Sequence, residues 1–209
     1  MKYIASCLLV AWCHCCFGQP ATNFLAVGDW SDFVRDDGGY ALRGRLLVGD
    51  SPCTNKSGRL DHVKVYVELC HFEEGFRGLP IEIYVDDLEC LHFELRDGSG
   101  ERIRAKRASE IFSISRASQP AFRLTIPWDS TVRLRTDYNL GGDTKPGEFD
   151  ITVPGVFWRI RPAATNDFFL SATFCPPTNT VSGSCHGWKG TLELPKVRIP
   201  VEKLRKQTT

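Results

Sequence analysis

The stretch 62–100 decides the fold, and its first run reads His62-Val63-Lys64-Val65-Tyr66-Val67-Glu68-Leu69. Apolar and polar residues alternate here with a period of two, which indicates a half-buried strand with one apolar side and one solvated side. Two similar runs follow at Ile81–Val85 and Leu91–Arg96, and Asp97-Gly98-Ser99-Gly100 closes the stretch as a turn. Because the apolar side needs a second layer to cover it, the stretch predicts an antiparallel sheet that packs against a second sheet.

The rest of the chain predicts more strands and no helix longer than two turns. Working outward, Tyr40–Val48 is the first clear strand before the central stretch. Beyond it, Phe122–Ile126 and Val132–Arg135 alternate on either side of the turn Pro127–Ser130, so we expect them to form a hairpin. In total, about ten strands at spacings of roughly 8–15 residues predict an all-β, two-sheet antiparallel sandwich.

The first residues resemble an export signal. Lys2 precedes an apolar run from Ile4 to Phe17 that is short for a membrane span, and cleavage after Gly18 satisfies the small-residue rule. We expect a secreted or periplasmic protein, because no later segment is long and apolar enough to span a bilayer. The expected organisation is a signal peptide over 1–18, an N-terminal arm over 19–39, a β-sandwich domain over 40–201 and a charged C-terminal tail over 202–209.

Charge argues against two classes of partner. The 209 residues carry 26 basic and 25 acidic side chains, and the formal net charge is +1. A general nucleic-acid binder or a binder of anionic membranes would have a clear basic excess. We therefore expect neither nucleic acid nor a membrane as partner, and no motif in the sequence predicts a cofactor.

Five of the nine cysteines lie beyond the expected signal: Cys53, Cys70, Cys90, Cys175 and Cys185. Export permits disulfides, and an odd number leaves at least one thiol unpaired or paired between chains. We predict a disulfide between Cys175 and Cys185 across the loop that separates them. Strand parity places Cys70 and Cys90 on the same side of neighbouring strands, as a disulfide or as two unpaired thiols.

Two motifs look catalytic but lack their partners. Gly49-Asp50-Ser51 ends a strand as the nucleophile block of SGNH-type esterases does, yet the Gly-x-Asn and Asp-x-x-His motifs of those enzymes are missing. Gly183-Ser184-Cys185-His186-Gly187 looks like a nucleophile elbow centred on cysteine, yet no helix follows it. The sequence therefore predicts no catalytic residue, and a small, esterase-like secreted hydrolase is kept as an alternative function.

Two groups of side chains have the chemistry of metal ligands. Cys70-His71 with Cys90-Leu91-His92 offers soft ligands for zinc, and Asp86-Asp87-Glu89 with Asp97 offers carboxylates for calcium. Neither group has the compact spacing of a zinc or EF-hand motif. We predict no metal site, and a carbohydrate- or metal-binding module stays open as an alternative. A cleft lined by tryptophans would favour that module; the candidates are Trp128, Trp158 and Trp188.

Arginines recur on the polar side of the alternating runs; they are Arg123, Arg133, Arg135, Arg159 and Arg161. If these strands are neighbours, the five guanidinium groups share one sheet face. The favoured interpretation is a solvated face with cross-strand acidic partners such as Asp150. The functional interpretation is an anion-binding face that docks a carboxylate- or sulfate-bearing polymer, because arginine presents a bidentate fork.

Several strand and turn motifs carry a family resemblance; they are Val65–Leu69, Leu79–Asp86, Phe93–Asp97, Thr165–Ser171 and Gly190–Pro195. Together they resemble an uncharacterised family of exported bacterial β-sandwich proteins, over the span from Tyr40 to Val201. The resemblance implies an immunoglobulin-like sandwich and a cell-envelope setting, and it carries over no functional residue. We expect a secreted, non-catalytic binding or envelope component whose partner is an envelope protein or an acidic polysaccharide.

Overall fold

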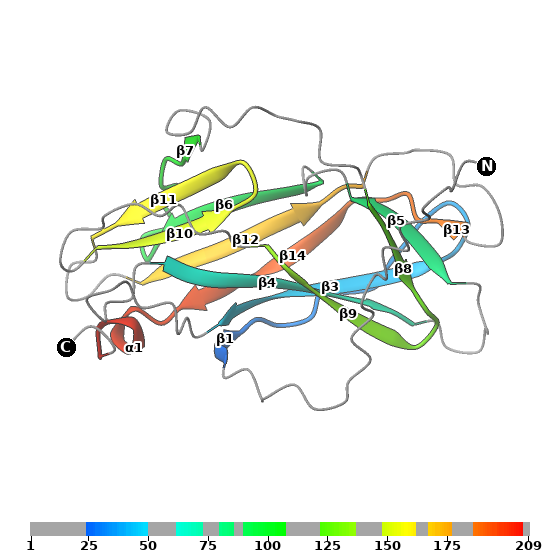
Figure 1. The fold of residues 1–209 in the computed structure, drawn as a ribbon, viewed down its shortest axis with the longest axis horizontal. Helices are drawn as coiled ribbons and strands as arrows, with labels where there is room; N and C mark the ends of the chain where they lie inside the picture. Colours follow the sequence, from blue (N-terminus) through cyan, green and yellow to red (C-terminus); the bar gives the residue numbers. More distant parts are fainter. Residues whose placement is uncertain are drawn as a thin grey trace, which may run out of the picture.

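The computed structural model describes residues 24–49, 62–72, 80–85, 90–107, 122–136, 148–161, 167–176 and 186–206, which form an all-β protein of three open sheets (Figure 1). The eight-stranded sheet has the order β1 (Phe24–Val27), β3 (Ala41–Gly49), β4 (His62–His71), β10 (Phe149–Val153), β11 (Val156–Ile160) and β7 (Lys106–Arg107), with β2 (Val34–Arg35) on β3 and β9 (Ser130–Arg135) on β4. One three-stranded sheet has the order β14 (Leu192–Ile199), β12 (Phe168–Phe174) and β6 (Leu91–Asp97), and the other has β13 (His186–Gly187), β5 (Ile81–Val85) and β8 (Phe122–Ile126).

The alternation predicted for β4 is confirmed on its apolar side. Val63, Val65, Val67 and Leu69 have no exposed surface. On β3, which pairs antiparallel with β4, Leu46 lies opposite Val67. Every second residue of both strands therefore enters the core, as a period of two requires.

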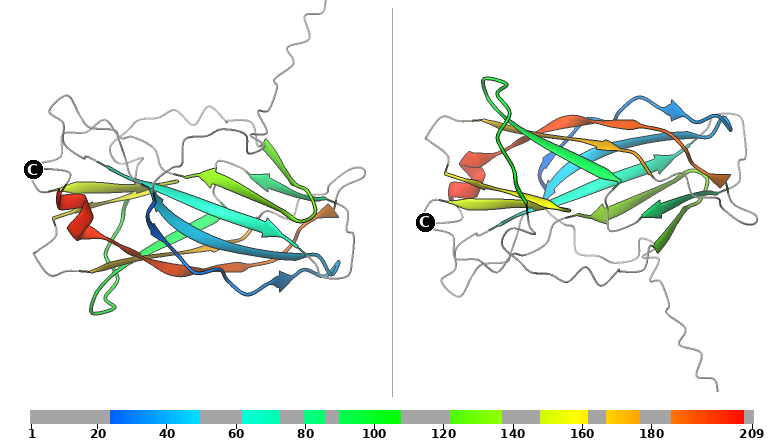
Figure 2. Two further views of the ribbon diagram at one scale, coloured as in Figure 1. Left: turned by 90° about the horizontal axis from the view of Figure 1, so that it is seen from below. Right: turned by 90° about the horizontal axis from the view of Figure 1, so that it is seen from above.

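The core lies between the eight-stranded sheet and the smaller sheets. Figure 2 shows β14 and β12 forming a layer beside β3 and β4. One hydrophobic cluster takes side chains from all three sheets, including Val67 of β4, Leu170 of β12 and Ile83 of β5. Burial on this scale is the main favourable contribution to the stability of a domain of this size.

Gly44 shows how closely two of the layers approach. A Cβ atom on this glycine of β3 would lie 2.5 Å from Cδ2 of Leu194 on β14 and 3.1 Å from the backbone oxygen of Glu68. Real Cβ contacts do not reach the shorter distance. A side chain here would force the buried Leu194 side chain to move within the packed core.

We expect Gly44→Ala to destabilise the protein by about 1–3 kcal/mol, because the added methyl group overpacks this contact. Urea denaturation measures the change. Gly98→Ala is the matched control, since its Cβ would have nothing nearer than 3.6 Å, and it should stay within about 0.5 kcal/mol of the parent protein. Equal stabilities for the two variants would mean that β3 and β14 are not in close contact.

The expected hairpin between Phe122–Ile126 and Val132–Arg135 is wrong. β8 pairs with β5 in a three-stranded sheet, whereas β9 pairs with β4 in the large sheet. The connection contains Pro127 and then Asp129, whose φ is +51°. A proline without an N–H and a left-handed residue end the ladder here, so the chain crosses from one sheet to the other instead of folding back.

Both ends of the expected domain carry structure. Two strands of the arm, β1 and β2, pair with β3. The segment expected to be a charged tail begins with the short helix α1, Val201–Lys206, and Lys203 donates a hydrogen bond to the carbonyl oxygen of Leu25 at 3.1 Å. Among the described residues, no helix has the length and hydropathy needed to cross a lipid bilayer.

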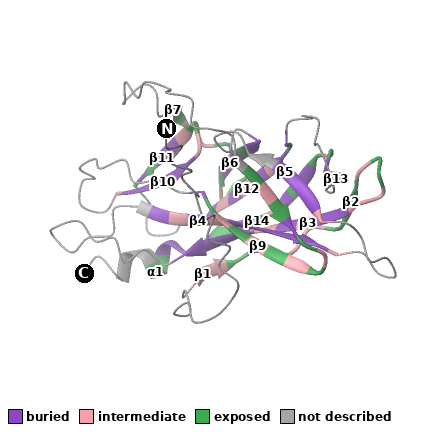
Figure 3. Ribbon diagram, turned by 45° about the vertical axis from the view of Figure 1, so that its right-hand side comes forward, coloured by how far each residue is buried: buried purple, intermediate pink, exposed green. Residues whose placement is uncertain are grey.

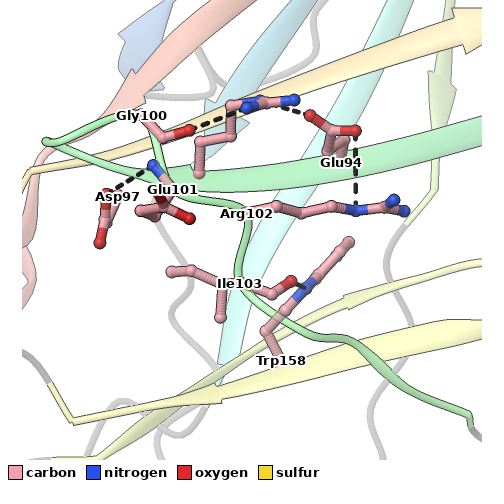
Figure 4. A network of polar contacts seen from close by, with 8 residues as sticks. Glu94, Asp97, Gly100, Glu101, Arg102, Ile103 and Trp158 are labelled. Carbon is pink, nitrogen blue, oxygen red and sulfur yellow. Dashed lines mark hydrogen bonds and ion pairs between the residues drawn. The ribbon is translucent and has the colours of Figure 1, made fainter.

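The free edge of β6 is covered by the segment that follows it (Figure 4). The Ile103 N–H donates to the carbonyl oxygen of Leu95 at 2.8 Å, and the Asp97 N–H donates to that of Glu101 at 3.0 Å. Trp158 of β11 donates from Nε1 to the Ile103 carbonyl oxygen at 3.0 Å, which ties the edge to the large sheet. Covering an edge in this way removes a template for unwanted strand pairing, so this polar network has a structural role.

Candidate ligand-binding face

The polar side of β3, β4 and β9 carries an ordered set of charges. The strand register places Arg45 of β3, Glu68 of β4 and Arg133 of β9 in one cross-strand row. Arg43 lies two residues before Arg45, so it projects from the same side of the sheet. We call this side of the eight-stranded sheet the outer face, because the core packs on the other side.

Glu68 is the anionic centre of the outer face. Arg45 donates from Nε to one carboxylate oxygen at 2.7 Å, and Arg133 donates from Nε and Nη2 to the other at 2.8 and 2.6 Å. The Glu68 side chain is only 4% exposed, whereas those of Arg45 and Arg133 are 26% and 40% exposed. The expectation that Glu68 is solvated is therefore wrong, because two arginines satisfy and cover its charge.

Aromatic rings from the N-terminal arm lie against these arginines. Cζ of Arg43 is 4.8 Å from the ring centroid of Trp30 and 4.6 Å from that of Phe33. Cζ of Arg45 is 4.4 Å from the Trp30 centroid. A guanidinium over an aromatic face is attracted by the ring quadrupole, so the segment between β1 and β2 is held on the outer face by cation–π contacts.

Three neighbouring rings form what we call the aromatic row: Phe33, Phe72 and Trp128. The centroids of Phe33 and Phe72 are 6.2 Å apart, and Phe72 stacks on Trp128 at 5.7 Å. Phe33 is 38% exposed. The other tryptophans proposed to line a cleft, Trp158 and Trp188, are each 2% exposed and belong to the core.

The five arginines predicted to share one face are divided between two sheets. Arg123 is on β8, outside the large sheet, and its Nη1 is 3.8 Å from Glu82 Oε1. Arg133 and Arg135 are on β9, where alternate residues are exposed (Figure 3). Arg159 is on β11, and Arg161 comes just after this strand. β11 joins the same large sheet through β10.

Arg159 and Arg161 also project from the outer face. Asp150 is in register with position 62 of β4 and with Arg159 of β11, so Asp150 and Arg159 are on the same side as Glu68. Arg159 donates from Nε and Nη2 to the two oxygens of Asp150, each at 2.9 Å. These hydrogen bonds raise the pKa of Arg159 above its usual value. The interpretation that Asp150 is a cross-strand acidic partner of these arginines is thus confirmed for Arg159.

The outer face has a cationic excess among the described residues. The strands β3, β9 and β11, with the residue that follows β11, place six arginines on it: Arg43, Arg45, Arg133, Arg135, Arg159 and Arg161. Three carboxylates lie on it: Glu68, Asp150 and Glu148, whose Oε1 is 4.0 Å from Arg161 Nε. The balance of the whole chain, at +1, conceals this local difference.

Arg43 and Arg45 are site residues that the sequence interpretation did not single out. Their signal was the same period of two, because both alternate with Leu42, Gly44 and Leu46. Their contact with Trp30 had no such signal, since it depends on where the arm packs. Local alternation can therefore assign a residue to a face but cannot say what covers it.

The cysteine predictions meet different outcomes. Cys70 is on β4 in the large sheet, whereas Cys90 packs in the core just before β6 of another sheet, and no disulfide joins them. The expected placement on neighbouring strands is thus corrected, because β4 and β6 are not paired. Cys175 has an exposed thiol, 3.7 Å from Thr191 Oγ1, but Cys185 lies outside the described residues.

The other candidate motifs are spread apart or lie outside the described residues. His92 is exposed on β6, away from Cys70 on β4. Within the described ranges, no three potential ligands are grouped so as to hold a metal ion. The predictions that rest on Asp50-Ser51, Gly183–Cys185 and Asp86–Glu89 concern residues outside the described ranges. Asp97 is described; its carboxylate accepts a hydrogen bond from the Ser99 hydroxyl, which lowers its pKa.

Comparison with protein families, with curated proteins and with solved structures finds no match to this chain. The candidate function is therefore argued from the outer face and its chemistry.

Proposed function

We propose that the protein is an exported, non-catalytic β-sandwich of the immunoglobulin-like kind that binds an acidic polysaccharide of the cell envelope through its outer face. The observation that carries the proposal is the cationic excess of that face, where six arginines accompany three carboxylates. Guanidinium groups bind carboxylates and sulfates through paired hydrogen bonds. A row of several such groups suits a ligand that repeats its charge.

Two further observations support binding to a polymer. Arg133 and Arg159 remain partly exposed at 40% and 33% although each holds a carboxylate, so their remaining N–H groups can reach a ligand. The aromatic row begins at Phe33 beside Arg43, and rings of this kind offer flat apolar surface to a sugar. The sandwich proposal itself is supported by the packing of β14 against β3.

The purified exported protein should be retained on immobilised polygalacturonate or dextran sulfate and not on neutral dextran. Binding should weaken strongly between ~0.05 M and ~0.5 M NaCl, because salt screens exposed charges. The double variant Arg135→Gln with Arg161→Gln should lose roughly tenfold in affinity, since each exposed charge contributes a few tenths to one kcal/mol. Isothermal titration at low salt measures the constants.

The matched control removes two exposed arginines from the segment after β6, as Arg102→Gln with Arg104→Gln. That double variant should bind within about twofold of the parent protein. Equal losses in the two double variants would point to non-specific attraction and contradict the proposal. Tighter binding to polyglutamate than to either polysaccharide would mean that the ligand is an acidic envelope protein and not a polysaccharide.

A further inference from the structure

Arg43 differs from Arg45, Arg133 and Arg159 of the outer face in its ion-pair partners. Arg45 and Arg133 share Glu68, and Arg159 holds Asp150. Arg43 has no acidic partner among the described residues, and its cross-strand neighbour is Cys70. Its Nε is buried and finds no hydrogen-bond acceptor in the part of the chain that the structure describes. Within the described ranges, this guanidinium is therefore positioned and partly desolvated without an acidic partner.

The surroundings of Arg43 hold the guanidinium in place. Its Cζ lies 4.8 Å from the Trp30 centroid and 4.6 Å from the Phe33 centroid. Burial of Nε adds to this constraint, because the group has few directions left in which to turn. A charge that is already oriented loses little conformational freedom when a ligand binds.

The chemistry next to Arg43 is suited to an anionic sugar. Phe33 contacts Arg43, is 38% exposed, and begins the aromatic row that continues through Phe72 to Trp128. An apolar ring surface beside a cation can accept a sugar ring and its charged substituent together. The planar guanidinium fork matches a carboxylate, which can accept two parallel hydrogen bonds.

We infer that Arg43, with Trp30 and Phe33, is the specificity-determining subsite of the outer face and takes a sugar residue that bears a carboxylate, of the uronic acid class. This inference rests on the proposed function, because it names the ligand unit that the same face selects. Arg43 binds the carboxylate and Phe33 contacts the sugar ring. The remaining arginines attract the polymer by charge.

The test compares Arg43→Lys with the parent protein in titrations against polygalacturonate and dextran sulfate. Lysine keeps the charge but loses the planar fork, so affinity for polygalacturonate, whose carboxylated sugar occupies the Arg43 subsite, should fall about tenfold. Affinity for dextran sulfate, which the remaining arginines attract by charge, should change by less than about twofold. Arg102→Lys, a distant exposed arginine, should change neither constant. Thermal melts establish that each variant is folded.

A second variant keeps the inference testable if Arg43→Lys fails to fold. Phe33→Ala removes a partly exposed ring outside the core cluster, and it should weaken binding to polygalacturonate about fivefold or more while leaving polyglutamate binding within about twofold. A folded Arg43→Lys or Phe33→Ala variant that binds polygalacturonate as tightly as the parent would overturn the inference and leave the proposed function standing. Equal losses for carboxylated and sulfated polymers would also overturn it. A parent protein that prefers no anionic polymer over neutral dextran would overturn both.

Discussion

Val67→Asp is expected to prevent the protein from folding. Val67 has no exposed surface and lies in the middle of β4, between Leu46 of β3 and Leu134 of β9. An aspartate there would place an unpaired charge in the hydrophobic core, at a cost of several kcal/mol against a total stability of about 5–15 kcal/mol. The yield of soluble exported protein and a thermal melt of any that is recovered measure the effect.

Lys64→Asp is the control for this prediction. Lys64 is on the same strand but on the outer side, and its side chain is half-buried. Away from the core, a change of charge should shift the free energy of unfolding by only about 0.5 kcal/mol. If Lys64→Asp unfolds while Val67→Asp folds normally, the two sides of β4 are assigned backwards and the arginines of the outer face would belong to the core side.

Glu68→Gln is expected to destabilise the folded protein. The substitution leaves Arg45 and Arg133 without the carboxylate that both now hold at 2.6–2.8 Å. Breaking a buried ion pair costs about 3–5 kcal/mol. Because Arg45 and Arg133 are 26% and 40% exposed, water recovers part of the loss, and we expect about 2 kcal/mol. Urea denaturation at constant pH gives this difference directly.

Glu82→Gln provides the comparison, since it makes the same substitution at another buried glutamate. The Glu82 side chain is 9% exposed, and among the described residues its Oε2 has no hydrogen-bond partner. Its ion pair with Arg123 is long, at 3.8 Å. Removing a poorly compensated charge relieves its desolvation, so the stability should change by less than about 1 kcal/mol in either direction. A larger loss at Glu82 than at Glu68 would mean that the two carboxylates have been ranked wrongly.

Alternation along the chain is enough to predict the main strands and their apolar sides. Val63, Val65 and Val67 could be assigned to the core, and Ile126 likewise, because side chains alternate along a strand whatever its neighbours are. The same alternation placed Arg133 and Arg159 on the polar sides of their strands. These are local properties, which follow from the backbone geometry of a few consecutive residues.

Which strands are neighbours and which charges are covered depends on the packing of the whole fold. β8 and β9 are adjacent in sequence but enter different sheets, and Glu68 is buried because Arg45 and Arg133 approach it from two other strands. Trp30 and Phe33 reach Arg43 from an arm that carries no regular pattern. Strand pairing and the burial of a charge both involve residues far apart in the chain. The free energies of these contacts depend on the packing of the whole core, so a local pattern in the sequence does not predict them.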